Sequence, residues 1–180
     1  NVLGADAAAG YSEKTPRRSM ARISDLRLRP GDSVKLRAGS VWKESLVVDD
    51  SGIDGRPITI GSYGDGKPPR ITAVRDCVIV NGDWVSITGV HVDGCEMAGF
   101  ELRGKGDSVR YSRATRNAIG VWAADTSDGA VVARNYLGYN NQMYTLTRSP
   151  DWDDAGAFGV LLHGLGAEVG YNTIVGHSAF

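Results

Sequence analysis

The sequence lacks several features that would assign it to common classes of protein. Positive and negative charges nearly cancel, with 20 Lys and Arg against 21 Asp and Glu, so no net field attracts nucleic acid or an anionic membrane. No apolar run approaches the roughly 20 residues that a membrane-spanning helix needs. No long helical pattern follows residue 30. We therefore expect neither a nucleic-acid partner nor a membrane span.

Cysteine is scarce as well. Cys77 and Cys95 are the only two cysteines, which is too few for a disulfide framework, and no metal-ligand spacing surrounds them. Two buried thiols that act as small hydrophobic side chains are the favoured interpretation. A single disulfide is the alternative, and it would suit an exported protein.

Glycine, by contrast, is abundant, with 24 residues, and short apolar runs recur between glycines. One set of runs begins at residues 77, 99, 120 and 159, and a second set, led by Val or Ile, begins at residues 34, 58, 85, 109, 131 and 169. Both sets share a period of roughly 22 to 27 residues and lengthen by about 16 residues between 140 and 156. A fixed period in this range indicates a solenoid.

A unit of this length that holds short strands and no helix predicts one turn of a parallel β-helix, and hence an all-β fold. The two sets would form two parallel sheets, and segments near residues 70 and 90 would supply the third side. Asn117, Asn135 and Asn172 would stack at a corner between successive coils. The predicted core consists of Val78, Val80, Ile87, Phe100, Leu102, Val121, Val131, Val160, Leu162 and Val169.

The two ends of the chain differ. Thr15 followed by Pro16 predicts a helix over residues 15–26 that covers the open end of a single β-helix domain spanning residues 1–180. No comparable cap follows the last strand. We therefore expect further coils, self-association or another chain at that end. Because the chain starts at Asn1 without a signal-peptide pattern, we expect any leader to have been removed.

The segment from residue 28 to residue 71 contains the phrases LRPGDSVKLRAGS and RPITIGSYGDGKPPRI. It resembles the N-terminal coils of right-handed parallel β-helix proteins of the pectate-lyase-like superfamily. The resemblance implies a right-handed coil and a secreted protein of bacterial or phage type. Members include pectate and alginate lyases, polygalacturonase-type hydrolases and tailspikes, and most act on polysaccharides. The matching residues build structure, so no catalytic role is carried over to them.

Alternation along the strands predicts one outer face that carries chemistry. Because alternate side chains of a strand point to opposite sides, Glu101, Arg103, Trp122 and His163 should point outward, and Asp125 follows directly after its strand. Arginine can bind a carboxylate through two hydrogen bonds, and an indole offers an apolar face to a sugar ring. The competing interpretations are a surface ion pair for Glu101 and Arg103, packing under the insertion for Trp122 and a plain surface position for His163. His91, with Asp93 nearby, is read as a surface residue.

The insertion over residues 141–156 interrupts the repeat just before the strand that bears His163. It carries Asp151, Asp153 and Asp154, whose carboxylates could hold Ca²⁺, and Trp152, which could contact substrate. A solvated turn is the alternative. We expect the insertion to fold back towards Trp122 and His163.

These residues lead to two functional hypotheses. The first is an exported lyase-type enzyme that acts on an acidic glycan, with His163 or Arg103 as the base and Ca²⁺ neutralising the uronate carboxylate. A hydrolase would instead use two carboxylates. The second is a non-catalytic glycan-binding, adhesin or tailspike-like module.

Overall fold

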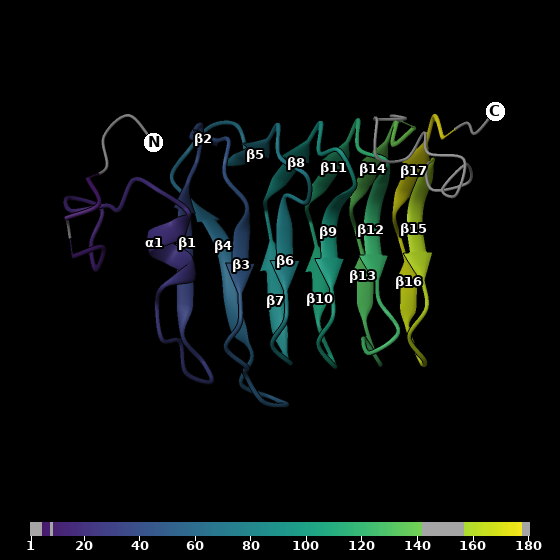
Figure 1. Ribbon diagram of the computed structural model, residues 1–180, viewed down its shortest axis with the longest axis horizontal. Coiled ribbons are helices and arrows are strands. Elements are labelled where there is room, and N and C mark those ends of the chain that lie inside the picture. The colour runs from purple at the N-terminus through teal and green to yellow at the C-terminus, as the bar shows by residue number, and fades with distance from the viewer. Residues whose placement is uncertain (1–4, 8, 142–156, 178–180) are drawn as a thin grey trace.

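The computed structural model describes residues 5–7, 9–141 and 157–177, which form a stack of short strands with one helical turn at its N-terminal end (Figure 1). Successive coils contribute one strand to each of three parallel sheets, except that sheet C has five strands where sheets A and B have six. Strands therefore pair with the corresponding strand of the next coil and not with their sequence neighbours. The parallel β-helix predicted from the repeat and the right-handed coil implied by the resemblance are confirmed.

Sheet A contains β1 (Ser33–Arg37), β4 (Ile58–Tyr63), β7 (Val85–Thr88), β10 (Ser108–Arg110), β13 (Val131–Ala133) and β16 (Glu168–Gly170). Sheet B contains β2 (Val41–Trp42), β5 (Arg70–Thr72), β8 (His91–Asp93), β11 (Arg113–Thr115), β14 (Tyr136–Gly138) and β17 (Thr173–Val175). Sheet C contains β3 (Leu46–Val48), β6 (Val78–Val80), β9 (Ala98–Leu102), β12 (Ile119–Ala123) and β15 (Phe158–Leu162). The two sequence ladders correspond to sheets A and C, and the third side is sheet B.

The core lies inside the coils, where one row of side chains from each strand points. Six predicted core residues are fully buried: Val78, Val80, Ile87, Phe100, Leu102 and Val121. The prediction that Val131 lies in the core is wrong, because Val132 pairs with Val109 and is buried in its place. A shift of one residue turns a strand side chain to the other face, so taking Val131, the first valine of this run, as the inward residue reverses the assignment.

The last described coil is more exposed than its sequence suggests. Val160 is only partly buried, whereas Leu162 is 40% and Val169 43% exposed. Both exposed residues are in register with buried residues of the preceding coil, Ala123 and Val132. Their exposure therefore comes from the absence of a further coil among the described residues and not from the direction in which they point. Coverage of this end by another chain stays a prediction.

The helix is shorter than predicted. It spans Ala21–Ser24 (α1), a single turn beside the first coil, and does not start at Thr15. The backbone amide of Met20 donates a hydrogen bond to the Glu44 carboxylate at 2.9 Å, so a side chain from a distant segment caps the turn. Met20, the residue just before the turn, is fully buried in the core, and Ile23, Leu26 and Leu28 pack partly buried against it, so this segment and not the helical turn alone covers the end of the stack (Figure 1).

The corners between sheets are held by side chains that bond to the next coil. Asn117 donates from its backbone and side-chain nitrogens to Oδ1 of Asn140, at 3.1 and 2.8 Å. At the corner between sheets A and B, Asn135 makes the same pair of bonds to Asn172. The prediction of one column is thus corrected to two, because Asn117 lies between sheets B and C and the other two lie between sheets A and B.

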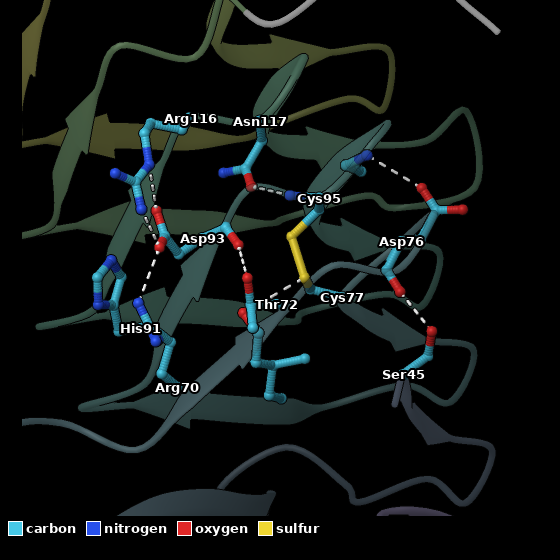
Figure 2. Close-up of a disulfide and its surroundings, with 12 residues drawn as sticks. Ser45, Arg70, Thr72, Asp76, Cys77, His91, Asp93, Cys95, Arg116 and Asn117 are labelled. Atoms are coloured by element: carbon cyan, nitrogen blue, oxygen red, sulfur yellow. Dashed lines mark hydrogen bonds and ion pairs between the residues drawn. A yellow bond between two sulfur atoms is a disulfide. The ribbon is translucent and has the colours of Figure 1, made fainter. Parts of the chain in front are cut away.

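Cys77 and Cys95 form a disulfide, so the favoured interpretation as two free thiols is wrong (Figure 2). Both residues are fully buried beside the corner between sheets B and C. They are 18 positions apart, and closing a loop of that size stabilises a fold by about 3 kcal/mol. The bridge joins this corner in two successive coils, and the backbone amide of Cys95 donates to Asn117 Oδ1 at 2.9 Å, so the asparagine column continues directly from the disulfide.

Asp107 gives the stability of the fold a specific dependence on pH. Its side chain is fully buried and accepts hydrogen bonds from the backbone amides of Val85 and Gly104, at 2.9 and 3.1 Å. Burial raises the pKa of Asp107 to about 7, and the hydrogen bonds only partly oppose this effect. Because the folded-state pKa lies above the usual 3.8, protonated Asp107 stabilises the fold, and that contribution disappears as the pH rises through 7.

We expect the free energy of unfolding to be higher at pH 4 to 5 than at pH 8, by at most about 4 kcal/mol. Urea denaturation across that range measures it. Asp107→Asn cannot ionise and should flatten the profile, whereas Asp128→Asn, at an exposed turn, should leave it intact. An unchanged profile in Asp107→Asn would contradict the assignment.

Candidate functional site

The outer face of sheet C brings together most of the residues selected from the sequence. Trp122 in β12 is in register with Glu101 in β9 and with Leu161 in β15. The backbone amides of Arg103 and His163 bond to Val80 and Ala123 respectively, at equivalent positions just past their strands. The side chains of one column therefore come from successive coils about 4.8 Å apart.

His163 is the centre of this cluster. Its Nδ1 lies 3.2 Å from Oδ1 of Asp125, and its ring meets the Trp122 indole edge to face, with the centroids 6.1 Å apart. The His163 side chain is 43% exposed. Asp125 and Trp122 come from the preceding coil, whose strand β12 is in register with β15. The imidazole is thus oriented from two sides and remains accessible to a ligand.

Glu101 and Arg103 form an ion pair, as the competing interpretation proposed, but it lies within one coil, whereas that interpretation placed it across neighbouring coils. Nε and Nη2 of Arg103 both lie 2.8 Å from Oε1 of Glu101. Nη1 donates to Asn81 Oδ1 at 3.1 Å in the preceding coil. Glu101 is nearly buried although it points outward, because Ile79 and Trp122 flank it in register and the arginine covers it.

The indole of Trp122 is half-buried, and its Nε1 is a buried donor without an acceptor among the residues that the structure describes. Substitution by Phe would therefore remove no hydrogen bond seen there. Ala124 occupies the position between Arg103 and His163. Its side chain is a single methyl group, which reaches less far than its neighbours in this column.

The remaining predicted site residues, Asp151, Trp152, Asp153 and Asp154, lie outside the described residues. In the parts of the chain that are described, no group of three or more His, Cys, Asp or Glu side chains is arranged to hold a metal ion. The calcium site therefore stays a prediction. Within the same parts of the chain, no helix is long and apolar enough to cross a membrane.

A polar network on sheet B was missed in the sequence, where His91 was read as a surface residue (Figure 2). Asp93 is almost fully buried and bonds to Arg70, at 3.2 Å, and to Arg116. Burial acts to raise the pKa of Asp93, but the bonds from Arg116 and Thr115 outweigh it and hold the pKa below its usual value. Burial lowers the pKa of His91, whose Nε2 lies 2.8 Å from the Thr115 hydroxyl.

These contacts are those of a structural network, which holds neighbouring coils of sheet B together. The sequence carries one signal of this network: Arg70, His91 and Arg113 occupy the same position in register in three successive strands of sheet B.

A cavity of about 800 Å³ lies at the opposite end of the molecule from His163, between the N-terminal segment and the first coil. Tyr11, Leu26, Trp42 and Tyr63 are among the residues that line it, and none of the site residues on sheet C does. The candidate site on sheet C therefore lies apart from this cavity. A row of side chains that runs across coils suits a long ligand better than a small one.

Comparison with known proteins gives both sequence and structural relatives. No family model matches the chain. It is 43% identical over 72 residues to a lacto-N-biosidase from Bifidobacterium longum subsp. longum, an alignment that covers 36% of this chain and 4% of that protein.

Among solved structures, pectate lyase Pel9A is similar with a TM-score of 0.68 and 17% identity, over 91% of this chain and 45% of that one. The GH136 lacto-N-biosidase from Eubacterium ramulus gives a TM-score of 0.49 and 16% identity, over 94% of this chain and 33% of that one. The chain thus spans less than half the length of these proteins. It is a parallel β-helix protein with the fold of pectate lyase Pel9A.

Proposed function

We propose that the protein is an exported enzyme that cleaves an acidic polysaccharide on the outer face of sheet C by β-elimination. The observation that carries the proposal is the exposed imidazole of His163, held between Asp125 and Trp122 next to the surface over Ala124. The names of the relatives, a pectate lyase and a lacto-N-biosidase, support a glycan as the substrate class. The disulfide favours an oxidising compartment, in keeping with export.

The proposed reaction needs a base, a group that orients the base and a partner for the substrate carboxylate. Histidine gains and loses a proton near neutral pH, so His163 is the base that removes the proton next to the uronate carboxylate. Asp125 lies against Nδ1 and leaves Nε2 for the substrate. The electron pair left on carbon then forms the double bond as the glycosidic oxygen departs with its bonding electrons and takes up a proton from water.

Arg103 is better suited to binding than to proton abstraction. A guanidinium keeps its proton in proteins, and this one is held by Glu101 and Asn81. Its position one coil before Ala124 suits the carboxylate of a sugar unit adjacent to the reacting one. The half-exposed Trp122 offers an apolar surface to a sugar ring between the two.

A glycoside hydrolase is the second candidate, and the sequence identity to a lacto-N-biosidase favours it. Such an enzyme would need two carboxylates, and this face supplies Glu101 and Asp125. Glu101 is, however, nearly buried and ion-paired, whereas Asp125 is 89% exposed at its side chain. Glu101 is thus engaged by Arg103 and Asp125 by His163, so neither carboxylate is left free for hydrolysis, and we place elimination first.

One assay separates the candidates. The protein is incubated with polygalacturonate, alginate, a sulfated glycosaminoglycan and a lacto-N-biosyl glycoside, in calcium and in a chelator. Elimination produces unsaturated ends that absorb ultraviolet light, hydrolysis produces reducing ends without that absorbance, and a binding module retards the polymer in a gel without product. Absorbance with any uronate polymer is the expected result. Reducing ends alone, or binding alone, would overturn the proposal in favour of hydrolysis or a non-catalytic module.

A further inference from the structure

A row of arginine and tyrosine side chains lies at the corner between sheets A and B, away from the site on sheet C. In three successive coils this corner is turned by a residue in the left-handed region, and these residues are Tyr111, Arg134 and Tyr171. The following residue in each coil, Ser112, Asn135 or Asn172, takes part in the hydrogen-bonded column that holds the corner. The backbone thus presents the three side chains outward, one per coil.

The side chains stack on one another. The guanidinium carbon of Arg134 lies 5.9 Å from the ring centroid of Tyr111 and 5.0 Å from that of Tyr171. Beside them, the guanidinium carbon of Arg113 lies 4.5 Å from the ring centroid of Tyr136. Arg110, at the end of β10, completes the set. We call Arg110, Tyr111, Arg113, Arg134, Tyr136 and Tyr171 the arginine–tyrosine ladder.

Among the described residues, the arginines of the ladder form no ion pair. No carboxylate oxygen of the described residues lies within 4.0 Å of Arg110, Arg113 or Arg134. Asp93, the buried acid of sheet B, is already bonded to Arg70 and Arg116. Three arginines therefore gather at one corner of a chain whose net charge is −1. Such a concentration has an electrostatic cost that a bound anion would remove.

The stacking also prepares the ladder for a ligand. A guanidinium that lies on an aromatic ring has lost part of its freedom before binding, and its N–H groups remain able to donate in the ring plane. Tyr111 is 62% and Tyr171 85% exposed, so their rings and hydroxyls are accessible. Planar donors for carboxylates and aromatic surfaces for sugar rings alternate at about 4.8 Å along the axis.

We infer that the arginine–tyrosine ladder is a second binding surface, which holds an anionic polysaccharide chain along the axis of the stack. The inference rests on the proposed function only for the identity of the polymer, a uronate or sulfated glycan. The ladder takes no part in the reaction. It would keep a long substrate attached while sheet C acts on another part of the same chain, which is the effect expected of two linked sites.

Affinity for polygalacturonate, measured by titration calorimetry and by retardation in gels that contain the polymer, tests the inference. The triple variant Arg110→Gln, Arg113→Gln, Arg134→Gln removes the charges of the ladder. The matched control Arg27→Gln, Arg29→Gln, Arg37→Gln removes three exposed arginines from the N-terminal end, so both variants have the same net charge. Tyr111→Ala, Tyr171→Ala tests the rings, and thermal melting followed by circular dichroism checks that each variant is folded.

The ladder variant should bind polygalacturonate roughly tenfold more weakly or worse, the control should stay close to the parent, and neutral dextran should bind to none of them. If both triple variants lost affinity for polygalacturonate equally, the loss would come from net charge alone, which would overturn the inference. Tighter binding of a single-stranded DNA oligonucleotide than of any acidic glycan would overturn the choice of partner.

All binding is measured in a His163→Ala background, where the site on sheet C is impaired. Ladder-dependent binding without cleavage by the parent would leave the inference standing and remove the proposed function. Cleavage by the parent with unaltered binding by the ladder variant would do the reverse.

Discussion

Replacing Phe100 by Ala is expected to lower the free energy of unfolding by about 3 to 5 kcal/mol. Phe100 is fully buried in β9, in the middle of the stack, and is in register with Val78 and Val121 of the neighbouring coils. Removing the ring would leave a cavity that the strands cannot close, because hydrogen bonds to both neighbouring coils fix their spacing. Urea denaturation at constant pH measures the loss.

Phe158→Ala provides the matched control. It deletes the same ring from the same sheet, but in the last described coil, where Phe158 is only half-buried. Its cost should be less than half that of Phe100→Ala. If Phe100→Ala does not fold, Phe100→Leu should still fold and cost roughly 1 to 1.5 kcal/mol. Equal costs for the two alanine variants, or a loss below about 1 kcal/mol at Phe100, would contradict the assigned interior.

The architecture could be predicted because a β-helix imposes its period on the sequence. Each strand pairs with the same strand one coil later, so apolar runs must recur at nearly constant spacing whatever their exact residues. Which residues of each strand point into the core is harder to predict from the sequence. Val131 and Val132 are chemically identical, and only the register with Val109 shows which of them enters the core.

Features that depend on contacts between distant segments escaped the sequence. The helix at the N-terminal end starts at Ala21 because Glu44 caps it, and no local signal marks that pairing. The Cys77–Cys95 bridge forms because both residues lie at the corner between sheets B and C in successive coils, and their separation of 18 residues in the sequence does not by itself reveal that they meet.

The candidate site was partly predictable for the same reasons. Alternation along strands was enough to place Arg103, Trp122 and His163 on one face. It did not predict that Glu101 would be buried, because burial depends on the neighbours in register, Ile79 and Trp122. The arginine–tyrosine ladder was missed since left-handed corners usually suggest Gly or Asn, whereas here the column of polar side chains beside them supports Tyr and Arg in that conformation.

The largest expected effect on activity is at His163. His163→Ala and His163→Gln should each lower kcat for uronate polysaccharide by about 10² to 10⁴, the usual contribution of a general base, with a small change in KM. The variants should stay folded, because the imidazole is exposed and, among the described residues, its ring contacts the Asp125 carboxylate and the Trp122 indole. Asp125→Asn should cause a smaller loss, since in the proposed mechanism Asp125 orients the imidazole and does not remove the proton.

The pH profile distinguishes a base from a residue that merely binds. Elimination needs the neutral imidazole, so the parent's kcat should fall as the solution becomes acidic, and the residual activity of His163→Gln should not show that fall. His91→Gln is the matched control, because His91 lies on sheet B and shares no contact with the sheet C face. It should keep the parent's kcat and pH profile even if it melts earlier. A His163→Gln variant that retains more than half of the parent's kcat, or the same acid limb, would remove His163 from the reaction. The base would then have to be sought elsewhere on the face between Arg103 and Asp125.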